Sequence, residues 1–314
     1  MLFHIFKWWI MLKRKSLNKI YLTTLVLFIM LVTITFDYLK ADKNNIIYET
    51  EYVSNLVNTH IYLLNKDNLL VKVDHLLRSN TLEENIEDII NELFVTNKKY
   101  NNLKGLIPSN TKLNRITIDD KTANLDFSND LLKVNKNIEE KVIESIVYSL
   151  IELEKIDNVK ITIEGNPLTK LEKNNKNLPI LLNESIGINK DYTLNSIKDI
   201  EKVVIYYVFN DNKDNYYVPV TKYVNSRDSK IKIIIDSLKG NYFSNTNLIS
   251  YLNRNSNIDF KLDTDILTIT FDSLNEDTLE SVTYSISNSV FDSVEKINKV
   301  IFEVNSKIID VKSK

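Results

Sequence analysis

An internal duplication constrains the fold of this chain more than any other feature. Residues 123–132, ANLDFSNDLL, read as an alternating apolar strand that ends in an Asp/Ser turn, and residues 267–276, LTITFDSLNE, repeat the pattern about 144 positions later. In an extended chain the apolar side chains of each stretch point to one face and the polar side chains to the other. The repetition predicts two copies of one small domain.

The neighbouring segments follow the same order in both copies. A strand pair over residues 60–73 matches one over residues 204–220, and each pair is joined by a polar turn. A short helix, the alternating strand with a partner before it, and a longer helix come next, and a strand at 158–165 or 299–305 ends the copy. The predicted order in each copy is therefore β-β-α-β-β-α-β.

The helices have recognisable start signals and one apolar stripe each. Thr81 with Glu84 forms a capping box, while Asn137 and Asp277 each precede a Glu by three positions at the start of a longer helix. Helices with one apolar stripe and strands with one apolar face bury both by layering. We therefore expect an α+β fold of two similar domains, each a mixed or antiparallel sheet with two helices packed on one face.

An uncharged segment precedes the two copies. Residues 20–36 are apolar enough to cross a bilayer, although this run is near the short limit for a spanning helix. Lys13, Arg14, Lys15 and Lys19 precede it, so the positive-inside rule places the amino terminus in the cytoplasm. The alternatives are a buried core helix and a cleaved signal peptide, whose cleavage site would be near Ala41. We expect a retained single-pass anchor in the cell membrane, with extracytoplasmic domains.

The patterns together divide the chain into six parts. The predicted parts are a cytoplasmic amino terminus at 1–19, a transmembrane anchor at 20–36, a juxtamembrane segment at 37–57, a first domain at 58–166, a linker at 167–200 and a diverged second domain at 201–310. Met1 and Met11 both remain open as the initiator. The linker residues 178–188 are too apolar for a free tether, so we expect them to pack on one domain and fix the angle between the two.

Composition argues against several classes of site. The chain has no Cys, which excludes disulfides, thiolate metal sites and a Cys nucleophile, and it has only three His. The net charge of −2 lacks the basic excess expected of a nucleic-acid partner. No phosphate-binding or hydrolase motif occurs. We therefore predict no catalytic residue, no metal, no cofactor and no small-molecule substrate.

Acidic residues are the remaining candidates for chemistry. We interpret Asp126 with Ser128, and Asp272 with Ser273, as strand-end turns whose side chains bond to nearby backbone amides. Two acidic helix faces are interpreted as solvated; they comprise Glu83, Glu84, Glu87 and Asp88 in the first and Glu139, Glu140 and Glu144 in the second. The alternative is a pair of carboxylates that hydrolyses or binds cell-wall polymer.

Tyrosines crowd the first strand pair of the second copy. Tyr is enriched at interfaces because its ring is apolar and its hydroxyl is polar. If Tyr206 and Tyr216 are buried against helices, the candidates for a partner interface reduce to Tyr207, Tyr217 and Tyr223.

The two copies resemble the GerMN domain family, which occurs singly or in tandem in spore-forming Gram-positive bacteria. The resemblance is carried by VPVTKYV (218–224), GLIPSNTKL (105–113), NLDFSNDL (124–131) and NVKITIEG (158–165). The second copy has no Pro in its turn at 248–257, and Asn110 replaces a Gly of the family pattern. The resemblance implies no enzymatic activity. It implies a structural role in a sporulation or germination complex of the envelope, in contact with other proteins of the complex or with other copies of the chain.

Overall fold

The computed structural model describes residues 24, 25, 27–32, 57–96, 99–100, 102–211, 215–240 and 246–314. The chain divides into two units, residues 1–54 and residues 55–314. Of the predicted anchor, residues 24, 25 and 27–32 are described; they are helical and exposed. The rest of that prediction, with the segments at 1–19 and 37–56, lies outside the described residues. Among the helices that are described, none has both the length and the apolar character needed to span a bilayer.

The first domain has the predicted order of elements. In chain order they are β1 (Val57–Leu64), β2 (Leu70–Leu77), α2 (Leu82–Glu92), β3 (Leu113–Asp119), β4 (Thr122–Phe127), α3 (Glu139–Ile151) and β5 (Asn158–Ile163), with the short β6 (Asn166–Pro167) behind them. Strands β3-β4-β5-β6 form one sheet, in which β4 and β5 run parallel.

The second domain repeats this order after the linker. The linker contains β7 (Lys170–Leu171), β8 (Lys176–Asn177), a 3₁₀ turn at Glu184–Ile186 and β9 (Asp191–Thr193). The second domain contains β10 (Ile200–Asn210), β11 (Asn215–Asn225), α4 (Lys230–Lys239), β12 (Leu248–Ile249), β13 (Ile258–Asp263), β14 (Ile266–Phe271), α5 (Leu279–Ser293), β15 (Lys299–Val304) and β16 (Lys307–Ser313). Its sheet is β13-β14-β15-β16, again with a parallel central pair.

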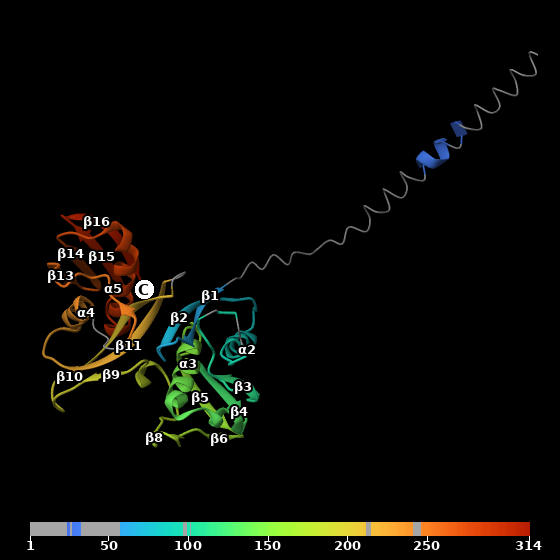
Figure 1. Cartoon of the computed structure of the whole chain (residues 1–314), viewed down its shortest axis with the longest axis horizontal. Coiled ribbons are helices and arrows are strands. Elements are labelled where there is room, and N and C mark those ends of the chain that lie inside the picture. The colour runs from blue at the N-terminus through green and yellow to red at the C-terminus, as the bar shows by residue number, and fades with distance from the viewer. Residues whose placement is uncertain are drawn as a thin grey trace, which may run out of the picture. The chain divides into compact units, whose positions relative to one another are not determined.

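The first strand pair of each domain does not join its own domain's sheet, which corrects the predicted fold. The two pairs instead form one sheet across the domains, in the order β1-β2-β11-β10-β12 (Figure 1). Domain contact within this sheet is narrow, because β2 and β11 pair only at Lys72 and Tyr217. The α+β class and the mixed sheets are as expected, whereas the fold has one sheet per domain and a third sheet shared between them.

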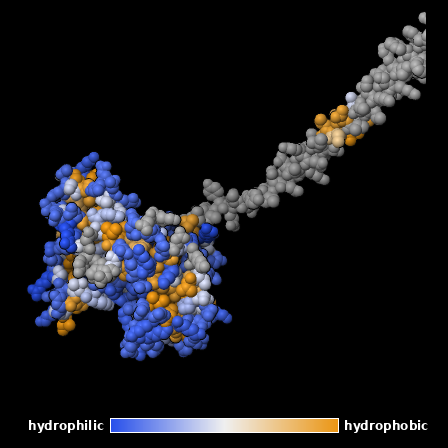
Figure 2. Space-filling view, viewed as in Figure 1, coloured by the Kyte–Doolittle hydropathy of each residue, from blue (hydrophilic) through white to orange (hydrophobic). Residues whose placement is uncertain are grey.

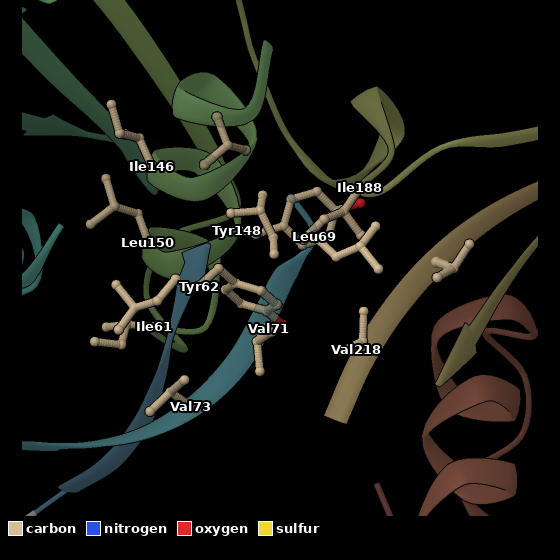
Figure 3. Close-up of a cluster of buried hydrophobic side chains, with 14 of the residues drawn as sticks. Ile61, Tyr62, Leu69, Val71, Val73, Ile146, Tyr148, Leu150, Ile188 and Val218 are labelled. Carbon is tan, nitrogen blue, oxygen red and sulfur yellow. The ribbon is translucent and has the colours of Figure 1, made fainter. Parts of the chain in front are cut away.

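The helices lie between the shared sheet and the sheet of each domain. In the first domain α3 packs on β1 and β5, and α2 packs beside it on β3. Helix α2 buries Ile86, Ile89 and Ile90 along one face, whereas α3 is buried on nearly every side because both of its flanks are covered. Figure 3 shows β1, α3 and β11 contributing to one apolar cluster, with Val218 of the second domain close to Val71 of the first.

The start of each longer helix differs from the prediction in the same way. Asn135 and Asn275 accept hydrogen bonds from the backbone N of Asn137 and Asp277, and each begins a 3₁₀ turn that leads into α3 or α5. The predicted caps Asn137 and Asp277 therefore lie inside the 3₁₀ turns. Thr81 caps α2 as predicted, accepting from the backbone N of Glu84 at 3.4 Å.

Candidate functional site: the junction between the domains

A tyrosine of β1 is held by three side chains that follow one another along α3 and its carboxyl end. The backbone N of Tyr62 donates to Ser149 Oγ at 2.9 Å, and its carbonyl accepts from Ser145 Oγ at 2.6 Å. The Tyr62 hydroxyl donates to Glu152 Oε1 at 2.6 Å. The two serine hydroxyls thus bond to the backbone groups of β1 to which a neighbouring strand would otherwise bond. These bonds matter because an unpaired buried backbone group is costly in free energy.

The second domain contains the same arrangement. The backbone N of Tyr206 in β10 donates to Ser289 Oγ at 2.9 Å, and its hydroxyl donates to Asp292 Oδ2 at 2.6 Å. Ser289 and Asp292 occupy the positions along α5 that Ser149 and Glu152 occupy along α3. This tyrosine–serine–carboxylate motif is therefore part of the duplicated fold and was missed in the sequence, because its members lie far apart along the chain.

Charged groups connect the two copies of the motif. Lys72 Nζ lies 2.9 Å from Glu152 Oε1 and 5.8 Å from the centre of the Tyr206 ring, so one ammonium contacts both domains. His60 Nδ1 lies 2.7 Å from Glu152 Oε2. Although burial alone would raise it, the hydrogen bond from His60 and the charge of Lys72 lower the pKa of Glu152 to about 2.

The protonation states of this cluster suit it to hold the two domains together. Burial and the neighbouring carboxylates hold the pKa of Tyr62 and of Tyr206 well above the usual value, so both hydroxyls stay protonated as donors. Glu152 is ionised and is hydrogen-bonded or ion-paired to Tyr62, Lys72 and His60. Among the described residues, no three His, Asp or Glu side chains are grouped to hold a metal.

A second charged cluster attaches the linker to α3. Lys190 forms ion pairs with Glu144 and, at 2.7 Å, with Glu140; Lys176 also pairs with Glu140. Lys141 Nζ lies 3.2 Å from Glu144. Although burial raises it, the hydrogen bonds and charges of Lys176 and Lys190 lower the pKa of Glu140. The prediction of a solvated face over Glu139, Glu140 and Glu144 was wrong, because the linker covers these residues.

Asn189 of the linker joins the strands of both domains. Its Nδ2 donates to the carbonyls of Leu70 and Pro219, each at 2.8 Å, and its Oδ1 accepts from the backbone N of Leu70 at 2.9 Å. Leu70 begins β2 and Pro219 lies in β11, so one buried side chain bridges the two halves of the shared sheet. Residues 178–190 thus connect the domains.

A pocket of about 180 Å³ lies beside the linker cluster. Its apolar lining comes from Ile143, Leu178, Pro179 and Ile186, and its charged lining from the lysines and glutamates just described. Because those charges are paired with one another, the pocket holds the linker on α3 and offers little free charge to a ligand.

The predicted tyrosine interface is only partly at the surface. Tyr206 and Tyr207 are both buried, each with 2% exposed, so Tyr207 is withdrawn as a surface candidate. Tyr217 is half-buried and stacks on Tyr284 of α5, with ring centres 3.7 Å apart. Tyr223 is half-buried against the exposed Tyr192 of β9, with centres 4.9 Å apart. A partner role for Tyr217 and Tyr223 stays a prediction.

The strand-end turn of the first domain is as interpreted from the sequence. Asp126 accepts from Thr162 Oγ1 at 2.6 Å and from the backbone N of Gly165 at 2.7 Å, and these hydrogen bonds lower its pKa. Ser128 Oγ accepts from the backbone N of Lys112 at 3.0 Å. On the other predicted acidic face, Asp88 pairs with the buried His75 at 2.7 Å.

Comparisons with known proteins agree with this fold. The family model described as Germane, sporulation and spore germination, matches residues 60–169. The spore germination protein GerM of Bacillus subtilis is 27% identical over 206 residues, which is 64% of this chain and 54% of GerM. The first domain therefore matches the GerMN family by sequence, and the chain as a whole is similar to GerM. It aligns with about half the length of that curated relative.

The duplicated GerMN arrangement also has a counterpart among solved structures. The tandem GerMN domains of the sporulation protein GerM from Bacillus subtilis match with a TM-score of 0.70. That match has 22% identity and covers 81% of this chain and 92% of the other. The structural match is evidence for the fold of both domains, whereas the family model matches the sequence of the first domain.

Proposed function

We propose that this chain is a membrane-anchored extracytoplasmic protein whose two GerMN domains support assembly of a sporulation or germination complex in the envelope. The proposal rests on the domain junction, where the ionisable side chains are engaged in joining strands, helices and linker. Such a junction fits a rigid scaffold that presents surfaces to other proteins. The relatives named for sporulation and germination support the process, and the uncharged segment at 20–36 supports the anchor.

The proposal excludes an enzymatic role for the clustered carboxylates. A glycosidase needs two carboxylates facing a cleft, one of them available to protonate a leaving group. Glu152 is held ionised by His60 and Lys72, which does not suit it to act as an acid. Incubating the protein with purified peptidoglycan tests this alternative, and release of muropeptides that E152Q fails to release would favour a hydrolase.

Genetic deletion tests the proposed role. We expect loss of the gene to lower the yield of heat-resistant spores or their germination, and the wild-type chain to restore it. A variant lacking residues 1–36 should be stable but fail to restore the phenotype, because it is no longer held at the membrane. Normal sporulation and germination in the deletion strain would refute the proposal.

A further inference from the structure

The outer faces of the two four-stranded sheets differ between the domains. In each domain the helices cover the inner face, where Leu125, Phe127, Leu267 and Phe271 are buried. Strand registers place the outer residues opposite one another. On β3, β4 and β5 of the first domain every one of them is polar: Arg115, Thr117, Asp119, Thr122, Asn124, Asp126, Asn158, Lys160 and Thr162; on β6, Pro167 lies opposite Thr162.

The same face of the second domain carries an apolar group. Ile301 of β15 lies opposite Thr268 of β14 and Val311 of β16, and Ile308 lies opposite Glu303. Ile308 is 55% and Val311 44% exposed, and the apolar surface over β16 is visible in Figure 2. The duplicated fold does not require this group, because the first domain has Lys160 where the second has Ile301.

Two charges of opposite sign flank the apolar group. Lys299 and Glu303 lie on the same face of β15, two residues before and after Ile301. Within the described part of the chain, neither has an ion-pair partner. On β15 the apolar group is therefore flanked by a positive charge on one side and a negative charge on the other, while Asp259, Lys261 and Asp263 of β13 carry the charges at the edge of the same face.

We propose that this outer face of β13–β16 binds the same face of a second copy of the chain. A two-fold axis that crosses the strands at Ile301 reverses the strand direction in the partner. It brings the apolar groups of the two copies together and sets Lys299 of each copy against Glu303 of the other. At the β13 edge it sets Asp259 against Asp263, a repulsion that weakens the contact. A self-complementary patch of this kind suits a closed two-fold dimer, formed by aligned sheet-on-sheet packing.

The size of the face sets the strength of the contact. Four strands about 4.8 Å apart, each with about six residues at about 3.3 Å, give a face of roughly 20 by 20 Å. A standard interface buries about 800 Å² on each partner, so this dimer is weak and dissociates on dilution. Copies held in one membrane would associate more readily, because tethering raises their effective concentration.

Charge reversal in the purified full chain tests the geometry. By sedimentation equilibrium in detergent, we expect K299E to weaken self-association by about tenfold or more, since the new carboxylate then faces Glu303 of the partner. The double variant K299E/E303K should restore it, because the pairs are exchanged on both sides of the axis. K160E on the outer face of the first domain is the matched control and should have no effect. A monomeric wild type at every concentration, or no rescue by the double variant, overturns the proposal.

The absence of Cys allows an independent test. We expect a short bis-maleimide to cross-link I301C of the full chain into a homodimer, because residue 301 faces itself across the axis at the roughly 10 Å that separates packed sheets. K160C, its equivalent in the first domain, should remain monomeric. Equal cross-linking of the two variants, or cross-linking of I301C only to a different protein, overturns the proposal. The inference goes beyond the envelope role, and both tests are independent of any sporulation phenotype.

Discussion

Replacing Asn189 with Ala should destabilise the junction more than any single substitution at the surface. The change removes the partners of three buried backbone groups, the N and O of Leu70 and the O of Pro219. An unsatisfied buried group costs about 1 to 3 kcal/mol, so three such groups cost roughly 3 to 9 kcal/mol, with values near the lower end where water enters the space. Asn189 also has φ 46°, a left-handed conformation that Ala adopts less readily, at a cost of about 1 kcal/mol.

Urea unfolding of residues 55–314, followed by circular dichroism, measures this loss. We expect N189A to lower the free energy of unfolding by about 4 kcal/mol, a large share of the roughly 5 to 15 kcal/mol typical of a domain. Its transition should also broaden or split, because the two domains lose their common bridge. N175A is the matched control, since Asn175 has φ 52° at an exposed site. If N189A loses no more stability than N175A, the bridging role of Asn189 is refuted.

Three further outcomes are expected of the same protein. Because the pKa of Glu152 is about 2 in the folded state against an ordinary 4.5, its stabilisation is complete above pH 4.5 and is lost as pH falls through 2. Between about pH 5 and pH 2, the free energy of unfolding of the wild type should thus fall by up to about 3 kcal/mol more than that of E152Q. The same pH dependence for both proteins in urea unfolding would contradict this. Y62F and Y206F should each cost about 1 to 2 kcal/mol by thermal unfolding, since each removes the tyrosine hydroxyl that donates to a carboxylate, and a neutral effect of both would count against the motif. G105A should cost about 3 kcal/mol, because its Cβ would lie 2.4 Å from the backbone oxygen of Leu93, whereas G165A meets no atom within 4 Å and should cost only about 1 kcal/mol for its positive φ; similar losses would be evidence against this packing.

The sequence was sufficient for the order of elements and for most of their faces. Alternation indicated the buried side of β4 and β14, and the stripe over Ile86, Ile89 and Ile90 indicated the buried side of α2, because these patterns depend only on local geometry. The capping box at Thr81 was also local. Pairing of strand pairs from different domains was not predictable, since β2 and β11 meet at only one residue pair and no local pattern specifies it.

The junction residues were missed for a related reason. Glu139 and Glu144 have the spacing of a solvated helix face, and their burial follows from a linker that returns along α3. The serines of α3 and α5 occur at buried positions of an otherwise apolar stripe, and this was the available signal. A small hydroxyl in the middle of a buried helix face indicates a backbone group nearby that needs a partner. On that basis, Ser145, Ser149 and Ser289 would have located the edges of β1 and β10.

The serine contacts of β1 and β10 affect where a strand of another protein can add to a sheet of this chain. An extended peptide adds to a sheet only where backbone donors and acceptors are vacant. At Tyr62 both backbone groups, and at Tyr206 the backbone N, are already bonded to helix hydroxyls. A strand from another protein is thus more readily added to one of the two four-stranded sheets, at their outermost strands β3, β6, β13 and β16, than to the shared sheet.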